Sequence, residues 1–170
     1  MSRAKWILLI ILIVIVAIQL YRPAMTNPPV DASRTVQATA QVPPQVDAIL
    51  RRSCYDCHSH ETRWPWYTKI APASWLLASD VNEGRQEANF SNWAAFDKPH
   101  AAKKLDRICK EVQGGDMPPW YYLPMHQTAK LSDADRQTLC NWAQGEEARI
   151  SAGLTPTERA ASAKAELEHD

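Results

Sequence analysis

The chain has 170 residues, which is enough for one domain with attached segments, and its 19 Lys and Arg residues balance its 19 Asp and Glu residues. Two of the basic residues precede a long apolar run, so the rest of the chain carries a small net negative charge. This balance excludes a basic nucleic-acid-binding protein, and we expect no nucleic acid partner. The presence of 4 Cys in so small a chain indicates that some of them serve chemistry and do not merely fill the core.

The first segment, residues 1–21, has two basic residues followed by an apolar run at 6–21. A cleavable secretory signal has small residues directly after such a run, but Arg22 and Pro23 stand there, so we predict a signal-anchor that is not removed. The run is at the short end of the roughly 17 to 25 residues that a transmembrane helix needs. We therefore predict an N-terminal transmembrane helix in the lipid bilayer, with the N-terminus in the cytoplasm and the rest of the chain outside.

The segments on either side of the central part have the composition of attachments. Residues 22–43 are rich in Pro and have no apolar periodicity, so we predict a flexible linker with a random-coil span of about 25 Å. Residues 151–170 are rich in Ala and Glu, and we expect Thr155 to begin a marginal helix in an exposed C-terminal tail. The remaining residues, 44–150, form the predicted domain.

The central segment begins with the motif Cys54-Tyr55-Asp56-Cys57-His58. Two thiols one helical turn apart can each add to one vinyl group of a haem, and the adjacent His then offers an imidazole nitrogen to the iron from the same side. A zinc site needs a second close pair of Cys, a thioredoxin-type dithiol needs a βαβ context, and a plain disulfide has no use for His58. The motif therefore predicts one covalently attached haem c, with Cys54 and Cys57 as attachment sites and His58 as the proximal iron ligand.

A second axial ligand is expected from Met117, which lies in the sequence Gly-Gly-Asp-Met-Pro-Pro-Trp. Pro118 forces Met117 into an extended conformation, and the two Gly residues let the backbone approach a flat ligand. A thioether held in this way can point at the iron. The alternative is that Met117 fills a gap beneath the loop, as most Met residues do. Met125 and His126 are the next candidates for the distal position.

Three stretches have the periodicity of amphipathic helices. Apolar residues at 46–53 recur at a spacing of three and four and lead into the Cys motif. A second stretch, 102–112, ends at Gly114, and a third helix begins at Ser132, with Asp135 as the acid of a capping box. We expect the helix from Ser132 to pack against the first one. No stretch alternates apolar and polar residues, so the sequence predicts an all-α domain.

The order of several short motifs points to a known family. The motifs are Cys54-Tyr55-Asp56-Cys57-His58-Ser59, Glu61-Thr62-Arg63-Trp64-Pro65-Trp66-Tyr67, Ile70-Ala71-Pro72, Ser74-Trp75, Asp116-Met117-Pro118-Pro119 and Leu131-Ser132-Asp133-Ala134. Over residues 46–148 the chain resembles the bacterial haem-binding domain family of small membrane-anchored c-type cytochromes. The resemblance implies a cytochrome-c-like helical fold around one covalently attached haem c and a location in the periplasm, at the inner membrane. It also implies the attachment and ligand roles given above, including Met117 as distal ligand.

Other residues near the motif have two readings each. Arg51, Arg52 and Arg63 could bind the haem propionates by charge-assisted hydrogen bonds, or they could be solvated surface charges. Aromatic side chains can shield a haem from water, because the haem replaces much of the core in so small a domain. The residues expected to do so are Trp64, Trp66, Trp75 and Trp93. The alternative for the cluster at 64–67 is contact with a redox partner.

Cys109 and Cys140 remain after the haem has taken its pair of thiols. Outside the cytoplasm two spare thiols usually form a disulfide, and both residues lie on the apolar sides of predicted helices. We therefore predict a disulfide between them, with two free and buried thiols as the alternative.

Ligation by His and Met fills both axial positions and raises the reduction potential, which suits electron transfer and does not suit substrate activation. The sequence therefore predicts a membrane-anchored monohaem cytochrome that transfers single electrons between periplasmic or membrane redox partners and is not itself an enzyme. A haem sensor or binder of diatomic ligands is the alternative if Met117 does not hold the iron. An accessory subunit of a membrane redox complex is a further alternative.

Overall fold

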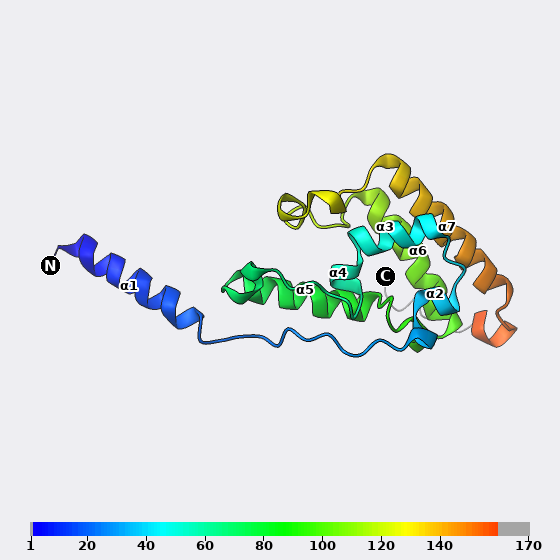
Figure 1. Ribbon diagram of the computed structural model, residues 1–170. Helices are drawn as coiled ribbons and strands as arrows, with labels where there is room; N and C mark the ends of the chain where they lie inside the picture. Colours follow the sequence, from blue (N-terminus) through cyan, green and yellow to red (C-terminus); the bar gives the residue numbers. More distant parts are fainter. Residues whose placement is uncertain (1, 160–170) are drawn as a thin grey trace.

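The computed structural model describes residues 2–159 and is all-helical, as the sequence predicts. One helix projects from a helical body (Figure 1), and no strand is present within the described residues. The α-helices are α1 (Arg3–Ile18), α2 (Val36–Thr39), α3 (Pro44–Ser53), α4 (Tyr55–His58), α5 (Ala73–Glu87), α6 (Lys98–Gly114) and α7 (Asp133–Ala152). Short 3-10 helices lie at Ala32–Arg34, Trp66–Lys69, Trp93–Ala95, Leu123–Met125 and Gln127–Ala129.

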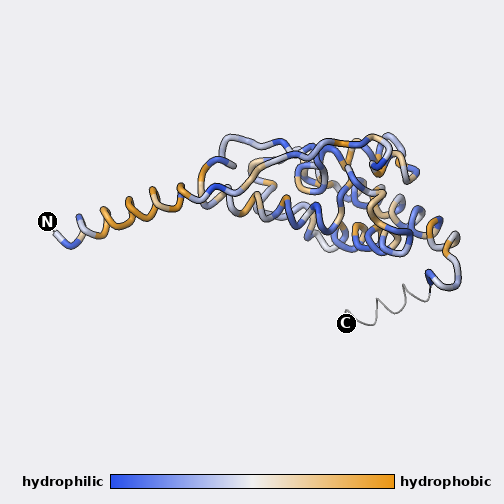
Figure 2. The backbone as a smooth tube through the Cα atoms, turned by 90° about the horizontal axis from the view of Figure 1, so that it is seen from below, coloured by the Kyte–Doolittle hydropathy of each residue, from blue (hydrophilic) through white to orange (hydrophobic). Residues whose placement is uncertain are grey.

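The apolar run at the N-terminus forms α1, which projects from the body and buries none of its residues (Figure 2). The helix ends at Ile18, because the N–H groups of Gln19 and Leu20 bond to carbonyls three residues back and form a turn. No helix within residues 2–159 is both long enough and apolar enough to cross a membrane. The apolar run predicted to span a membrane over 6–21 is found as a helix that lies three residues nearer the N-terminus, and the prediction of a transmembrane helix is not supported.

The segment that follows α1, residues 19–35, is a mostly extended strap that lies along the body (Figure 1). It begins with a turn and ends with the 3-10 helix Ala32–Arg34. Its first residue is tied to the body twice: Gln19 donates to the carbonyl of Ala71 over 3.2 Å and accepts from the N–H of Ala71 over 2.9 Å. Further along, Arg85 of α5 donates to the carbonyl of Thr26 over 2.9 Å. The strap is extended, as its Pro content favours, but it is bonded to the body where the sequence predicts a flexible linker.

The predicted helix over 46–53 is confirmed as α3. Pro44 occupies its first turn, where the missing N–H would have had no helical partner in any case. Val46, Ile49 and Leu50 form its buried face. The helix ends immediately before Cys54, and α4 follows at once, so the Cys motif lies at a break between two helices.

Helix α5 is not predicted by the sequence. Its buried residues are mostly small, namely Ser74, Ala78, Val81 and Gly84, and no side chain caps its N-terminus. A stripe of small residues mixed with Asp and Asn gives almost no periodic apolar signal. Packing against α4 stabilises this helix, so tertiary contact decides a segment that its local sequence leaves open.

Helices α6 and α7 pack along each other. Helix α6 begins at Lys98, earlier than predicted, because the Asp97 side chain caps it by accepting an N–H of the first turn. Its end is set by Gly115, whose φ of 85° few other residues adopt. Helix α7 begins as predicted, with Ser132 and Asp135 exchanging both bonds of a capping box.

A disulfide joins α6 to α7 through Cys109 and Cys140, the pair expected from the sequence. Around it lies the apolar core, in which Leu50, Leu105 and Leu139 are fully buried. The core thus lies among α3, α6 and α7. The packing that the sequence predicts between the helix from Ser132, α7, and the helix before the Cys motif, α3, is present.

The start of the C-terminal tail is also helical. Thr155 and Glu158 exchange hydrogen bonds of 2.7 and 3.3 Å in a second capping box, and the helix continues to the last described residue. Residues 160–170 of the predicted tail lie outside the described residues.

Candidate functional site

A cavity of about 390 Å³ lies between α4, α5, α6 and the loop that follows α6. Its wall contains all four residues to which the sequence assigns a haem-binding role, Cys54, Cys57, His58 and Met117. The first three come from one short stretch of chain, whereas Met117 comes from beyond α6. The fold therefore brings the two predicted halves of the site to one place.

His58 is held by two backbone carbonyls. Its Nδ1 lies 2.8 Å from the carbonyl oxygen of Gly84 and 3.0 Å from that of Ala88. Because both partners are acceptors, Nδ1 carries the proton and Nε2 keeps its lone pair. Burial lowers the pKa of His58, which keeps the ring neutral at pH 7. A neutral imidazole with a fixed tautomer is the form that binds iron.

The thiols of Cys54 and Cys57 are not joined to each other. Both open onto the cavity but are otherwise surrounded by protein, and burial raises the pKa of each thiol to about 12. The carboxylates of Asp80 and Asp56 raise the pKa of Cys57 further. At neutral pH both side chains are therefore neutral thiols and not the thiolates that bind zinc.

Gly84 allows α5 to approach the Cys motif closely. A Cβ atom at this position would lie 2.8 Å from the carbonyl oxygen of Cys57 and 3.2 Å from the Cβ of Cys57. The nearer contact, which is to backbone, is shorter than a protein interior tolerates, and the second is tight. The carbonyl of Gly84 also accepts from His58, so this glycine both permits the approach and orients the imidazole.

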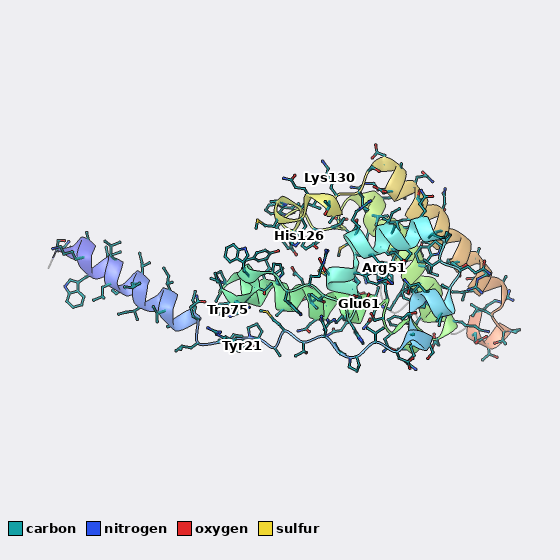
Figure 3. All side chains as sticks on the ribbon, viewed as in Figure 1. Tyr21, Arg51, Glu61, Trp75, His126 and Lys130 are labelled. Carbon is teal, nitrogen blue, oxygen red and sulfur yellow. A yellow bond between two sulfur atoms is a disulfide. The ribbon has the colours of Figure 1, made fainter. Side chains whose placement is uncertain are left out.

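Met117 lies in the cavity wall just after the left-handed Gly115, partly buried against the core. Its N–H bonds to the carbonyl of Glu111 over 3.3 Å, which fixes the start of the loop on the end of α6. The other two candidates for the distal position lie outside this cavity. Met125 is 62% exposed. The His126 ring, labelled in Figure 3, stacks on the Tyr122 ring and is hydrogen bonded to the hydroxyl of Tyr67.

Asp56, inside the Cys motif, connects the motif to the loop that carries Met117. It accepts from the hydroxyl of Tyr122 over 2.8 Å and from Arg63 over 2.9 Å. Burial acts against ionisation, but these two hydrogen bonds outweigh it and lower the pKa of Asp56. Burial and the bond to Asp56 raise the pKa of Tyr122. The charged Asp56 carboxylate and the neutral Tyr122 hydroxyl thus join two walls of the cavity by a hydrogen bond.

The three Arg residues considered for the propionates lie outside the cavity wall. Each of the three forms an ion pair with a carboxylate, and the Nε of Arg52 is buried without a hydrogen-bond partner within residues 2–159. Arg51 pairs with Asp47 and Glu61, Arg52 with Asp135, and Arg63 with Asp56. The basic residues in the wall are instead Lys104 and Arg107, both on α6.

The Trp residues expected around the haem also lie elsewhere. Trp66 is 69% exposed, and Trp93 is buried in the core, where it stacks on Phe90 with ring centres 5.8 Å apart. Smaller apolar side chains and Pro rings form much of the wall. They include Phe90, Ile108, Val112, Pro118, Pro119 and Leu131.

The residues of this cavity fit a haem. They combine a neutral imidazole, a thioether and two neutral thiols with apolar walls, which are the groups that hold haem c in proteins. The buried hydroxyl of Ser53, also in the wall, has no hydrogen-bond partner within residues 2–159. Within the same residues no cluster of three or more His, Cys, Asp and Glu side chains could hold a metal ion alone.

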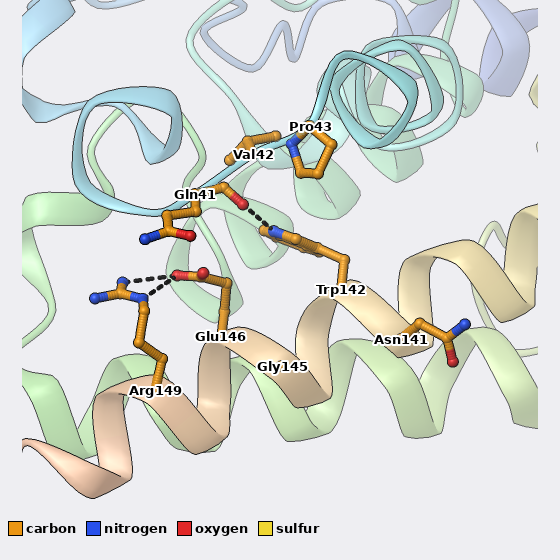
Figure 4. A pocket seen from close by; sticks show the side chains of 8 residues that line it. All are labelled: Gln41, Val42, Pro43, Asn141, Trp142, Gly145, Glu146 and Arg149. Carbon is orange, nitrogen blue, oxygen red and sulfur yellow. Dashed lines mark hydrogen bonds and ion pairs between the residues drawn. The ribbon is translucent and has the colours of Figure 1, made fainter.

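A second hollow of about 570 Å³ is wide open to the surface, between α7 and the segment that precedes α3 (Figure 4). Trp142 donates to the carbonyl of Gln41 over 2.9 Å, and Glu146 pairs with Arg149 over 2.7 Å. Two pairs of its polar groups thus satisfy each other, and its lining among the described residues contains no thiol, thioether or imidazole. The side chains that can attach a haem or bind its iron therefore lie in the first cavity.

The fold and the cavity together define a small all-helical protein with a site for haem. The family model of the haem-binding domain matches residues 13–145, and the chain belongs to this family. The match begins within α1, so the strap lies inside the family's domain. Cytochrome c peroxidase Ccp from Escherichia coli (strain K12) is 29% identical over 97 residues, which are 55% of this chain and 21% of that protein. The chain thus spans about a fifth of that relative, and no solved structure matches it.

Several residues of the site are not found by sequence reasoning. Gly84 had a signal, since a glycine within an uninterrupted helix often marks a close approach, but α5 itself was not recognised. Lys104 and Arg107 lie on a recognised helix, where nothing local shows which side faces a cavity. Tyr122 gave no signal at all, because its partner Asp56 is 66 positions away.

Proposed function

We propose that the protein is a monohaem c-type cytochrome that transfers single electrons and is not itself an enzyme. A bound haem supplies an iron that alternates between Fe(III) and Fe(II). In this proposal Cys54 and Cys57 attach the haem, and His58 and Met117 are the axial ligands. The proposal is carried by the presence of these four side chains in one cavity, with the Nδ1 of His58 fixed by two carbonyls.

Covalent attachment is supported by the state of the two thiols. Each S–H adds across one vinyl double bond, with the sulfur on one carbon and the hydrogen on the other, so no oxidant is needed. The raised pKa values of Cys54 and Cys57 slow formation of the competing disulfide, because the thiolate is the species that reacts in that route. Their positions, one turn apart beside His58, suit two neighbouring attachment points.

Electron transfer is supported by the two axial side chains. Carbonyl acceptors at Nδ1 make His58 a better electron donor, and a thioether from Met117 favours Fe(II) and raises the potential. If His58 and Met117 both bound the iron, they would leave no coordination position there for a substrate. The rival function, binding of a diatomic ligand, requires Met117 to be absent from the iron or easily displaced.

The deciding experiment is an optical spectrum of the purified protein, oxidised, reduced, and reduced with CO. We expect the weak thioether-to-iron band in the oxidised protein and slow or absent CO binding in the reduced protein. Met117→Ala should remove the band, admit CO and lower the potential, whereas the matched control Met125→Ala should do none of this. Wild-type protein that binds CO as readily as Met117→Ala would reject the carrier and favour a ligand-binding sensor.

Attachment is tested separately. Treatment of the denatured protein with acidified acetone should leave the haem on the chain, because thioether bonds survive it. Replacing either Cys54 or Cys57 by Ser should leave at most one thioether, seen as a change in the mass of the haem peptide and in the absorption of its pyridine complex. Release of the haem from the wild-type chain would contradict covalent attachment.

The peroxidase relative suggests one competing activity, the reduction of peroxide. That reaction needs an open coordination position at an iron, which Met117 opposes. We therefore expect no turnover when hydrogen peroxide and a reduced electron donor are added to the wild-type protein. Sustained oxidation of the donor, at a rate well above that of Met117→Ala, would make the protein an enzyme and overturn this part of the proposal.

We further propose that α1 attaches the protein to a bacterial inner membrane, with the haem domain in the periplasm. The helix exposes apolar side chains along its whole length, a surface that lipid would cover. A disulfide between α6 and α7 suits an oxidising compartment. The protein should sediment with membranes, and protease added to spheroplasts should digest the haem domain. A mature N-terminus near residues 25 to 41, or recovery in the soluble fraction, would contradict the attachment.

A further inference from the structure

Two cations line the haem cavity, and both lie on the same side of α6. Arg107 is already paired, with Glu87 over 2.6 Å and with Glu111 over 3.3 Å. Lys104 has no carboxylate within ion-pair distance among the described residues, and its ammonium group lies 4.9 Å from the centre of the Phe96 ring. Burial lowers the pKa of Lys104, so this cation is held where water does not fully solvate it. An anion brought by the ligand of the cavity would stabilise it.

The cations and the thiols lie at different ends of the cavity. The charged and polar neighbours of the Cys57 sulfur include Asp80 and Tyr121. Those of Lys104 include Glu87, the last residue of α5. Cys57 itself packs against Gly84, about one turn before Glu87 on the same helix. The cavity thus has a thiol end, beside Asp80 and Gly84, and a cationic end, beside Glu87.

The chemistry of haem assigns these two ends. Its two vinyl groups lie on one edge of the ring, and its two propionates lie on the opposite edge. Attachment to Cys54 and Cys57 therefore turns the propionate edge toward the cationic end. We propose that Lys104 and Arg107 bind the two haem propionates by charge-assisted hydrogen bonds. This inference rests on the proposed attachment, which fixes the orientation of the ring.

Lys104 should be the stronger of the two partners. Arg107 already shares its charge between Glu87 and Glu111, both of which also line the cavity and repel a propionate. Lys104 has no such competitor within ion-pair distance in the part of the chain that the structure describes. Its removal should therefore leave one propionate without a counter-ion, while removal of Arg107 also frees two carboxylates next to the other propionate.

The test compares charge-removing variants of the haem-loaded, full-length chain. Lys104→Met and Arg107→Met keep most of the side-chain length. Lys103→Met removes the same charge from an exposed position on the same helix that does not line the cavity. The propionate bending bands in the resonance Raman spectrum and the midpoint potential are measured for each, and Lys104→Arg tests rescue by a conserved charge.

We expect Lys104→Met to shift a propionate band and to lower the Fe(II)/Fe(III) equilibrium constant about fivefold, which is ~40 mV for one electron. Lys103→Met should change that constant less than about twofold, because water and salt screen an exposed charge. Lys104→Arg should restore both readouts. If Lys104→Met and Arg107→Met leave the bands in place and shift the potential no more than Lys103→Met, the propionates lie elsewhere and the inference is wrong.

The proposed function and this inference fail in different ways. Free haem after acid-acetone treatment, or an open sixth position, rejects the function, while the Raman bands still report whether Lys104 and Arg107 contact the propionates. Unchanged bands in a chain with attached haem reject only the propionate assignment. If Lys104→Met loads less haem than wild type, Lys104→Arg examines the same contact with its charge kept, and Arg107→Met examines the second cation independently.

Discussion

Replacement of Gly84 by Ala tests whether the close approach of α5 to the Cys motif is required. The added Cβ would lie 2.8 Å from the carbonyl oxygen of Cys57 and 3.1 Å from its carbonyl carbon. Backbone atoms cannot rotate away, so α5 must move by several tenths of an ångström. The movement would also displace the Gly84 carbonyl from the Nδ1 of His58, which now lies at 2.8 Å.

The magnitude follows from two opposing effects. Overpacking of this kind costs about 1 to 3 kcal/mol, whereas Gly to Ala within a helix gains about 0.8 to 1 kcal/mol from backbone entropy and helix propensity. Gly145 of α7 is the matched control, because a Cβ there meets nothing within 4 Å. The propensity gain cancels between the two variants. Gly84→Ala should therefore be less stable than Gly145→Ala by about 1 to 3 kcal/mol.

Urea unfolding of both variants, followed by far-ultraviolet circular dichroism, measures this difference directly. For a chain of this size each kcal/mol corresponds to about 2 to 4 °C in Tm, so a thermal scan provides a second estimate. Gly84→Ala should also carry less attached haem per chain, because His58 loses part of its support. Equal stabilities of the Gly84 and Gly145 variants, with equal haem content, would refute the reasoning.

Three further predictions concern the thiols, a helix cap and the disulfide. In haem-free protein at pH 8, a pKa of about 12 lowers the thiolate fraction of Cys54 and Cys57 about 1,000-fold. Iodoacetamide should therefore label these thiols more than tenfold slower than in the urea-unfolded chain, and the labelling rate should rise with each unit of pH. Equal rates in the folded and unfolded chains would contradict the burial. Ser132→Ala should lower the free energy of unfolding by about 1 kcal/mol through loss of the capping box, and an unchanged urea midpoint would contradict this. Cys109 and Cys140 should resist alkylation in the denatured chain until they are reduced. Reduction should lower the free energy of unfolding by about 3 to 4 kcal/mol on the chain-entropy estimate. Labelling without reductant would show that the disulfide is absent.

Features of the chain that depend on neighbours in sequence were open to prediction. The Cys54-to-His58 motif is one, because its spacing alone places two thiols and an imidazole within one turn. The capping box at Ser132 is another, because both bonds connect residues three apart. Helix α3 and most of α6 also followed from apolar periodicity, since each has one wide buried face.

Other features were hidden because their partners are distant in sequence. The N-terminal helix ends at Ile18 and the strap is bonded through Gln19 to Ala71, 52 positions later, so neither the end of α1 nor the fixed path of the strap was predicted. Hydrophobicity measures how apolar a run is and not where its helical hydrogen bonds stop. Composition likewise indicates that a Pro-rich segment is extended, but not which surface it will bond to.

The site itself divides along the same line. The sequence by itself determined which side chains can attach haem and bind its iron, because that chemistry depends on residue type and local spacing. Only the tertiary structure decided how these groups are oriented and what surrounds them. It places Gly84 against Cys57 and two carbonyls at the Nδ1 of His58. It also places Lys104 in the cavity wall, where the Arg residues near the motif do not lie. The physical reason is that a contact across helices depends on the packed positions of whole elements, and those positions are set by many weak interactions distributed over the chain.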